Sequence, residues 1–263
     1  MARGHEVDLA GRRNADLQLD VSSPLSDSIR PNSYDAVVNA AAAFKDGDFA
    51  YKHSSALVNS LGPITIANLA VEVGAKHVVH LSSASSCEKV GDPYFTWYSL
   101  SKRQGEEVME FLCAENNLAL TVVRPSQIYE DSGASKEHQP LFFALLAAIQ
   151  TGTKILLNGS NDAVRNFIHA EDVCNAIVHI VEQKIQGTYQ LAHPESHRLT
   201  EVIRLASEAF GKQADYEFSP DLADIKDYGI VPDNDFYQQW GCWPSISLSD
   251  GIHRLRAWAE DQR

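Results

Sequence analysis

The sequence predicts an α/β protein built on a doubly wound parallel sheet, with a smaller lobe formed mainly by its C-terminal part. Over the first two-thirds of the 263-residue chain, short apolar segments alternate with helical stretches. The apolar segments are rich in β-branched residues and lack polar alternation, which is typical of strands buried on both faces of a parallel sheet. Strand–helix alternation of this kind indicates helices packed on such a sheet.

The elements follow one another in a regular order. Strands are expected at 6–10, 36–39, 77–81, 120–123 and 187–192. Helices are expected at 49–73, with a break near Gly62-Pro63, and at 98–116, 170–183, 199–210 and 248–258. Gly211 directly follows the fourth of these helices, as expected of a helix end. The segment 213–245 is rich in loops and aromatic residues, which suits a small lobe closing over a site.

Composition and charge restrict the partners of the protein. Acidic residues outnumber basic ones 35 to 22, giving a formal charge of −13, which argues against nucleic acid or an anionic membrane as the main partner. The N-terminus has no apolar signal core and no stretch approaches a transmembrane length, so we expect a cytoplasmic protein. The four scattered cysteines predict free thiols, and the ten dispersed histidines predict no metal site.

A tyrosine, a lysine and a serine form the first candidate site. Tyr98 stands four residues before Lys102, so both side chains lie on one face of the predicted helix. The ammonium can lower the pKa of the phenol by favouring phenolate, and Ser83 can hold the reacting oxygen. This is the chemistry of proton transfer beside a hydride donor. The alternative is a helix-surface pair and a serine in an ordinary turn.

These residues belong to an ordered series of short motifs. The series is Leu19-Asp20-Val21, Val38-Asn39-Ala40-Ala41-Ala42, Asn59-Ser60-Leu61-Gly62, His80–Ser85, Tyr98–Lys102, Arg124-Pro125-Ser126-Gln127-Ile128-Tyr129, Arg165-Asn166-Phe167-Ile168-His169 and Leu248-Ser249-Asp250-Gly251-Ile252. In this order the chain resembles the extended short-chain dehydrogenase/reductase family, in its nucleotide-sugar epimerase, dehydratase and ketoreductase branch. The resemblance runs along nearly the whole chain and implies a Rossmann-like fold.

The resemblance also implies roles for individual residues. Tyr98 would be the acid/base, assisted by Ser83. Lys102 would lower the pKa of Tyr98 and hold the ribose hydroxyls of the cofactor. Asn59 would order a proton relay. The implied cofactor-binding residues are Asp20, Val21, Ala40, Ala41, Ala42, Asn59, Tyr98, Lys102, Pro125 and Ile128. The implied substrate-binding residues are Ser85, Ser126 and Arg165.

Two arginines bear on the choice of cofactor. Arg12 and Arg13 end the first predicted strand, where an NAD enzyme usually carries an acidic residue for the ribose 2′-hydroxyl. Arginine suits a 2′-phosphate instead, so we expect NADP in preference to NAD. The alternative is two solvent-exposed arginines without a ligand.

The resemblance divides the chain into two interleaved parts. Residues 1–125 with 152–192 would form the dinucleotide-binding domain, and 126–151 with 193–263 the substrate-binding lobe. The family begins with a strand, a GxxGxxG turn and a helix, and the N-terminal part of this sequence contains no such turn. Three explanations are open: a true N-terminus before Met1, a shortened relative that packs differently, or a second chain that supplies the element. We expect the first.

The expected function is that of an NAD(P)-dependent oxidoreductase or epimerase acting on a nucleotide-activated sugar. The resemblance also implies a homodimer, formed through the helices near 53–73 and 98–116. Epimerisation and ketoreduction both remain open. A dehydratase is disfavoured, because such relatives carry an Asp-Glu pair where this chain has Ala84-Ser85. The alternative is a catalytically impaired binding or regulatory protein of the same fold, suggested by the absent glycine turn; the retained Ser83, Tyr98 and Lys102 argue against it.

Overall fold

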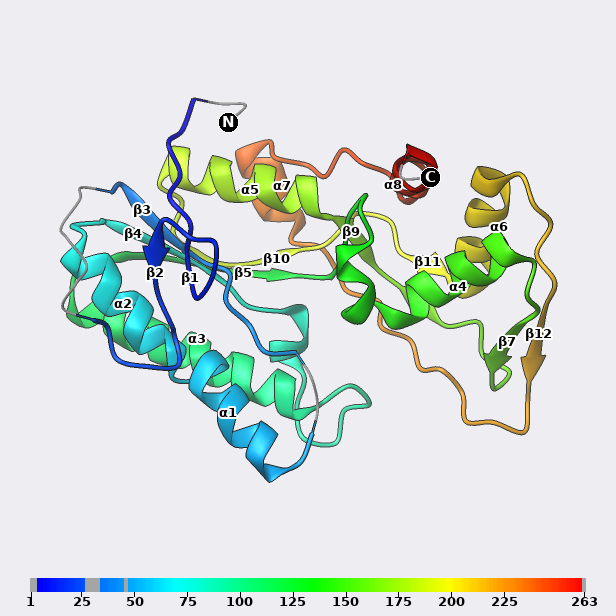
Figure 1. Cartoon of the computed structure of the whole chain (residues 1–263), viewed down its shortest axis with the longest axis horizontal. Helices are drawn as coiled ribbons and strands as arrows, with labels where there is room; N and C mark the ends of the chain where they lie inside the picture. The colour runs from blue at the N-terminus through cyan, green and yellow to red at the C-terminus, as the bar shows by residue number, and fades with distance from the viewer. Residues whose placement is uncertain (1–3, 27–33, 45–46, 262–263) are drawn as a thin grey trace. The chain divides into compact units, whose positions relative to one another are not determined.

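The computed structural model describes residues 4–26, 34–44 and 47–261, which form two compact units (Figure 1). Unit 1 comprises Met1–Arg124 with Ile180–Thr188, and unit 2 comprises Pro125–His179 with Tyr189–Arg263. The mixed α/β architecture and the central parallel sheet confirm the predicted fold class. Each unit is described by itself.

The main sheet has the strand order β10-β5-β4-β3. These strands are β3 (Ala36–Asn39), β4 (His77–Leu81), β5 (Ala119–Pro125) and β10 (Gly187–Leu191). β3 pairs in parallel with β4, and β4 in parallel with β5, so the carboxyl ends of the three strands share one edge. In β4, Val78 and Val79 are both fully buried, as the unbroken apolar run predicts for a strand covered on both faces.

A second, two-stranded sheet lies in the N-terminal part of unit 1. It consists of β1 (Ala10–Gly11) and β2 (Leu17–Gln18), which run parallel. The strand predicted at 6–10 is therefore wrong over most of its length. Val7 and Leu9 are apolar, as expected of a buried strand, but their side chains are about half exposed or more.

Three helices of unit 1 carry or support the site residues. The predicted helix at 49–73 is two helices, α1 (Phe49–Asn59) and α2 (Gly62–Glu72), because Pro63 lacks a backbone N–H and fits only the first turn of a new helix. The third is α3 (Trp97–Glu115), which begins with a capping box between Thr96 and Ser99. This cap fixes the first turn of α3, where Tyr98 lies.

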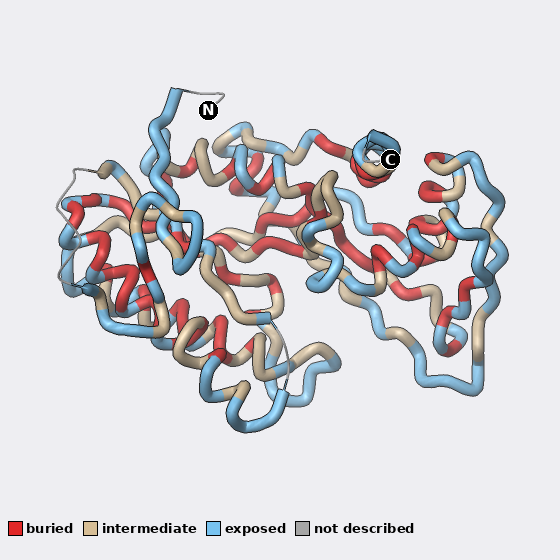
Figure 2. The backbone as a smooth tube through the Cα atoms, in the orientation of Figure 1, coloured by how far each residue is buried: buried red, intermediate tan, exposed pale blue. Residues whose placement is uncertain are grey.

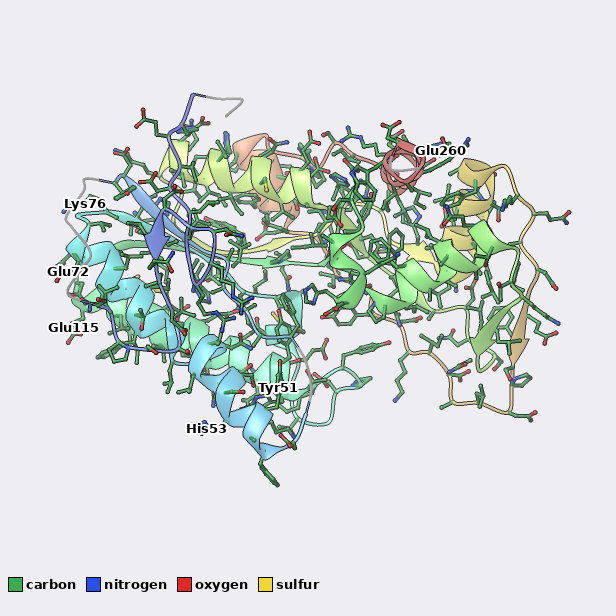
Figure 3. The ribbon with its side chains drawn as sticks, viewed as in Figure 1. Tyr51, His53, Glu72, Lys76, Glu115 and Glu260 are labelled. Atoms are coloured by element: carbon green, nitrogen blue, oxygen red, sulfur yellow. The ribbon has the colours of Figure 1, made fainter. Side chains whose placement is uncertain are left out.

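The core of unit 1 joins these helices to the sheet, and Figure 2 shows buried residues along their inner faces. Met109 of α3 is fully buried against residues of α2 and β4. The side chains labelled at the ends of α2 and α3, Glu72 and Glu115, are exposed (Figure 3). Both helices end there and the next strands begin, so this end of the unit lies opposite the carboxyl ends of β3 and β4.

One stretch contradicts the expectation that nothing in the chain approaches a transmembrane length. By length and composition, Phe49–Glu72 could cross a membrane, with a mean hydropathy of 1.2, but 56% of that window is buried inside the protein. The break between α1 and α2 and their packing against α3 account for this burial. A buried core helix of a soluble protein has the same composition, so the stretch is weak evidence for a membrane segment.

Unit 2 is built from four helices and three strand pairs around its own core. The strand pairs are β6 (Gln127–Tyr129) with β9 (Phe167–His169), β7 (Ile155–Asn158) with β12 (Tyr216–Ser219), and β8 (Val164–Arg165) with β11 (His197–Arg198). The helices are α4 (Pro140–Thr151), α6 (Leu199–Phe210), α7 (Asn234–Trp240) and α8 (Leu248–Asp261). α5 (Ala170–Gln183) runs from unit 2 into the segment assigned to unit 1.

The close approach of α8 to β6 depends on Gly251. A methyl group at that position would lie 2.1 Å from the hydroxyl oxygen of Tyr129, whose side chain is buried. The loop-rich segment 213–245 ends at a carboxylate of α5: Asp172 accepts hydrogen bonds from the backbone N–H groups of Ser245 (2.9 Å) and Ile246 (3.1 Å).

The compact units differ from the predicted domains at Pro125, at residues 152–179 and at residues 189–192. The prediction placed them with the dinucleotide-binding domain, whereas the structure places them in unit 2. For residues 152–179 the reason lies in strand pairing, because β7, β8 and β9 all pair with strands of unit 2.

Candidate active site

The candidate site lies in unit 1, where β4 ends and α3 begins. Ser83 follows β4 in an extended conformation and caps the short 3₁₀ helix Ala84–Cys87. Its hydroxyl oxygen accepts a hydrogen bond from the backbone N–H of Ser85 at 3.2 Å and lies 2.9 Å from the Ser85 hydroxyl. The two predicted site serines therefore form a hydroxyl pair at the carboxyl end of β4.

The structure brings Tyr98 to this serine. A hydrogen bond joins the Tyr98 hydroxyl to Ser83, and Phe44 stacks on the tyrosine ring with centroids 5.3 Å apart. Burial raises the pKa of Tyr98 to about 12, while the hydrogen bond to Ser83 acts in the opposite direction. The sequence predicts that the Lys102 ammonium lowers this pKa; in the structure burial dominates and the opposing contribution comes from Ser83, so the phenol is neutral at pH 7.

Lys102 lies one helical turn after Tyr98 and is 1% exposed. Its ammonium donates a hydrogen bond to the backbone carbonyl of Leu81, the last residue of β4, at 2.6 Å. Burial lowers the pKa of Lys102 to about 8, and the nearby Glu106 charge acts to raise it. The ammonium has three N–H donors, of which one binds Leu81, so it has further donors with which it could bind a ligand.

Asn59 fixes the segment after β3, and its role in a proton relay stays a prediction. Its side-chain oxygen accepts from the backbone N–H of Ala43 at 2.8 Å. Its side-chain nitrogen donates to the carbonyl of Ala43 at 2.9 Å and to the hydroxyl of Ser101 at 3.0 Å. Asn59 is 2% exposed, so these bonds hold the Ala40–Ala43 segment to α1 and α3 from inside the protein.

A buried asparagine–histidine pair, Asn39 and His80, joins β3 and β4. Asn39 uses its side-chain oxygen to accept from the backbone N–H of Ala41, so its nitrogen donates to Nδ1 of His80 at 3.0 Å. His80 is therefore neutral with its proton on Nε2, and Nε2 has no hydrogen-bond partner among the described residues. Burial lowers the pKa of His80 to about 3, and the Lys102 charge acts in the same direction.

This histidine predicts a loss of stability in acid. Below its ordinary value of 6.5 the unfolded chain takes up a proton at His80, whereas the folded protein does so only near pH 3, so stability falls as pH decreases through this range. A single such group costs about 2 kcal/mol between roughly pH 7 and pH 5. We expect His80→Gln to remove that part of the pH dependence of the free energy of unfolding, measured by chemical denaturation at both pH values. His53→Gln, at an exposed position on α1, is the control and should leave the pH dependence unchanged.

The predicted cofactor-binding residues of unit 1 lie after β1, β2 and β3. Arg12 and Arg13 are exposed directly after β1, and Asp20 follows β2. Asp20 accepts hydrogen bonds from the hydroxyl and the backbone N–H of Ser22, which lower its pKa, with a smaller contribution from Arg12. Val21 is half-buried after Asp20, and Ala40, Ala41 and Ala42 continue from the carboxyl end of β3.

Four predicted residues lie in unit 2, so no contact between them and the tyrosine–serine–lysine group is described. Pro125 ends β5, and Ile128 lies in β6, opposite Ile168 of β9. Ser126 is buried, and its hydroxyl has no hydrogen-bond partner among the described residues. Arg165 is 5% exposed and donates from Nη1 to the carbonyls of Val164 (2.8 Å) and Lys226 (2.7 Å).

The histidines and acidic residues form no metal site in the part of the chain that the structure describes. His193 and His197 are four residues apart, but they lie in and beside a short strand rather than on a helix. No group of three or more histidine, cysteine or acidic side chains able to hold a metal occurs in residues 4–26, 34–44 and 47–261.

Sequence reasoning missed three parts of this site. Phe44 is one of them, since nothing in the sequence indicates that it stacks on Tyr98. The Asn39–His80 pair is another, although both residues stand at the same register position of neighbouring strands. The third is Glu106, whose four-residue spacing from Lys102 is the signal that could have revealed it.

The parallel sheet, the helices α1–α3 and the tyrosine–serine–lysine group define a Rossmann-like α/β protein with a candidate active site at the carboxyl ends of its strands. The model of the NAD dependent epimerase/dehydratase family matches residues 1–192. The chain belongs to that family, which confirms the resemblance seen in the motifs.

Solved structures share the fold at low sequence identity. The structure of RMD from Pseudomonas aeruginosa complexed with NADPH has a TM-score of 0.76 and 17% identity, covering 94% of this chain and 89% of that chain. UDP-glucuronic acid 4-epimerase from Bacillus cereus in complex with NAD has a TM-score of 0.71 and 18% identity, covering 92% and 76%. UDP-glucose 4-epimerase from Thermotoga maritima, with UDP-glucose, has a TM-score of 0.69 and 18% identity, covering 87% and 78%.

Proposed function

We propose that this protein is an NAD(P)-dependent epimerase or oxidoreductase that acts on a nucleotide-activated sugar. The observation that carries the proposal is the contact of Tyr98 with Ser83, with the buried Lys102 one turn further along α3. A nicotinamide cofactor, when bound, supplies a carbon that can accept and return hydride. The residues of this chain would then move the proton that accompanies the hydride.

Tyr98 is the proposed proton carrier. Its hydroxyl would take the proton from a sugar hydroxyl during oxidation and return it to the carbonyl oxygen during reduction. The Ser83 hydroxyl would share a hydrogen bond with the same sugar oxygen, and its pairing with Ser85 fixes its position. Because burial keeps the phenol neutral, Tyr98 is ready to act as the acid; acting as the base requires positive charge nearby.

Lys102 provides one such charge within the same helix face. Its donors would bind the ribose hydroxyls of the cofactor, and its ammonium would favour phenolate at Tyr98. Ala40–Ala42 would border the cofactor at the carboxyl end of β3; the next residue, Ala43, is bonded to Asn59. The residues present therefore suit a nicotinamide nucleotide at this edge of the sheet.

NADP is the proposed preferred cofactor, with NAD as the alternative. Arg12 and Arg13 are both exposed at the end of β1, where planar guanidinium groups can pair with a 2′-phosphate.

The nucleotide-sugar class is supported by similar proteins rather than by a contact in this chain. Structures that share the fold are described with UDP-glucose, UDP-glucuronic acid or UDP. Ser85, Ser126 and Arg165 are the proposed substrate contacts; Arg165 binds the backbone carbonyls of Val164 and Lys226 through Nη1. Epimerisation and ketoreduction would both use the proton-transfer group of Tyr98, Ser83 and Lys102.

A homodimer in the cytoplasm is the proposed state of the protein. Large apolar side chains are exposed on α1, α2 and α3 and at the turn between α1 and α2, which is unusual for a surface without a partner. They are Phe49, Leu61, Ile64, Val71 and Phe111. A second copy packing through these helices would cover them.

The second candidate is a binding or regulatory protein that retains the fold. The sequence lacks a GxxGxxG turn in its N-terminal part, and the β1–β2 pair is a sheet separate from β3 among the described strands. A protein of this kind would bind a nucleotide or a partner without turnover.

A product analysis tests the proposed function. The protein is incubated with UDP- and GDP-sugars and each nicotinamide cofactor, and the sugars are analysed by NMR and mass spectrometry. A change of configuration or oxidation state at one sugar carbon supports the enzyme. Saturable nucleotide binding without any sugar product supports the second candidate.

A further inference from the structure

Glu106 is a buried carboxylate that no motif or proposed role uses. It lies on α3 one turn after Lys102 and two turns after Tyr98, and it is 3% exposed. Burying a carboxylate destabilises the fold unless its oxygens accept hydrogen bonds or pair with a positive charge, so the contacts of Glu106 indicate its role.

The contacts of Glu106 join α3 to the ends of two strands. Arg124 at the end of β5 binds it in a fork, with Nε 3.1 Å from Oε1 and Nη2 2.5 Å from Oε2. The hydroxyl of Ser82, the residue before Ser83, donates to Oε1. The backbone N–H of Ser82 also binds the carbonyl of Val123 at 2.8 Å, so the carboxylate, β4 and β5 form one connected unit.

This arrangement sets the geometry of the candidate active site. Tyr98 and Lys102 belong to α3, whereas Ser83 belongs to the end of β4, so the site forms only when helix and strand keep one register. Glu106 is bonded to the residue directly before Ser83 and lies on the helix that carries the other two groups.

The charges around Lys102 give Glu106 a second effect. The positive groups on neighbouring elements are Arg124 on β5 and, when protonated, His80 on β4; the His80 pKa is held low, so it stays neutral. Tyr98 on α3 is neutral as well. Glu110, also on α3, acts on Arg124. The negative charge of Glu106 acts to raise the pKa of the buried Lys102 ammonium.

We propose that Glu106 is a positioning residue of this site: it locks α3 to the ends of β4 and β5, and its carboxylate is the counter-charge that keeps the buried Lys102 an ammonium. The role of Lys102 rests on the proposed function, whereas the coupling of Glu106 to Lys102 is a property of the folded protein alone. A purely structural Glu106–Arg124 pair would stabilise the fold without affecting the protonation of Lys102.

The test is a titration of Lys102 itself in the full-length protein. The ε-carbon signals of ¹³C-labelled lysine are followed by NMR as pH is raised, and the Lys102 signal is assigned by its loss in Lys102→Arg. Glu106→Gln keeps the size of the side chain and removes its charge. We expect its Lys102 to lose about tenfold in proton affinity, a shift of about one pH unit.

Glu107→Gln is the matched control, because Glu107 is the next residue on the same helix and is exposed. It should leave the Lys102 titration unchanged. An unchanged titration in Glu106→Gln, or an equal shift in both variants, would overturn the proposal.

A second variant covers a failure of Glu106→Gln to fold, since that change leaves Arg124 without its charge partner. Glu106→Gln/Arg124→Gln removes both charges, so it is compared with Arg124→Gln alone: the proton affinity of Lys102 should be about tenfold lower in the double variant. Equal Lys102 titrations in these two folded variants would contradict the proposal. The titration needs neither cofactor nor sugar, so its outcome is separate from that of the product analysis.

Discussion

Replacing Tyr98 with phenylalanine is expected to lower kcat by a factor of about 10²–10⁴ while leaving cofactor binding nearly unchanged. The variant keeps the ring that stacks on Phe44 and loses only the hydroxyl bonded to Ser83. Turnover is measured on the nucleotide sugar found by product analysis, and cofactor binding by nicotinamide fluorescence.

Tyr216→Phe is the control for this result. Tyr216 is an exposed tyrosine on β12 of unit 2 and has no proposed role, so its loss of a hydroxyl should not affect turnover. Turnover in Tyr98→Phe equal to that of the control would remove the phenol from the mechanism.

Gly105→Ala is expected to give the largest loss of stability among single methyl additions in unit 1. A Cβ at Gly105 would lie 2.1 Å from the carbonyl oxygen of Asn59, and that backbone atom cannot rotate away. Overpacking of this kind costs up to about 3 kcal/mol, and the better helix propensity of alanine returns only about 1 kcal/mol. We expect a net loss of about 2 kcal/mol in the free energy of unfolding, measured by chemical denaturation.

The same change should also disturb Asn59, whose side chain holds Ala43 and Ser101. Gly11→Ala is the matched control, since a Cβ there meets only Ala15 at 3.8 Å. Equal stabilities for the two variants would show that α1 and α3 can separate freely at Gly105.

The parts of the fold that sequence predicts well are those fixed by local chemistry. β3, β4 and α5 begin and end where their apolar periodicity indicates, and Gly62-Pro63 marks the break between α1 and α2. The sequence predicts that segment 213–245 is rich in loops, without indicating the strand β12 and the helix α7 that it contains. β12 is held by pairing with β7, a contact of long sequence separation that local pattern does not encode.

The site shows the same limit. The spacing of Tyr98 and Lys102 along one helix face is local; both lie on α3, where Lys102 binds the last residue of β4, and their catalytic roles stay predictions. The direction of the Tyr98 pKa was not predictable, because it is set by burial among elements that are distant in sequence, which outweighs the hydrogen bond to Ser83. Glu106 was missed for a similar reason, since its partners Ser82 and Arg124 come from two different strands.

A cofactor titration tests the central claim most directly. The protein is titrated with NADPH and with NADH, and nicotinamide fluorescence reports binding to the wild type and to Lys102→Met. The account predicts saturable binding in the wild type, tighter for NADPH, and clearly weaker binding when the Lys102 ammonium is removed. An absence of saturable binding of either cofactor up to about 1 mM, the limit of weak specific affinity, would contradict the account and favour a binding or regulatory protein.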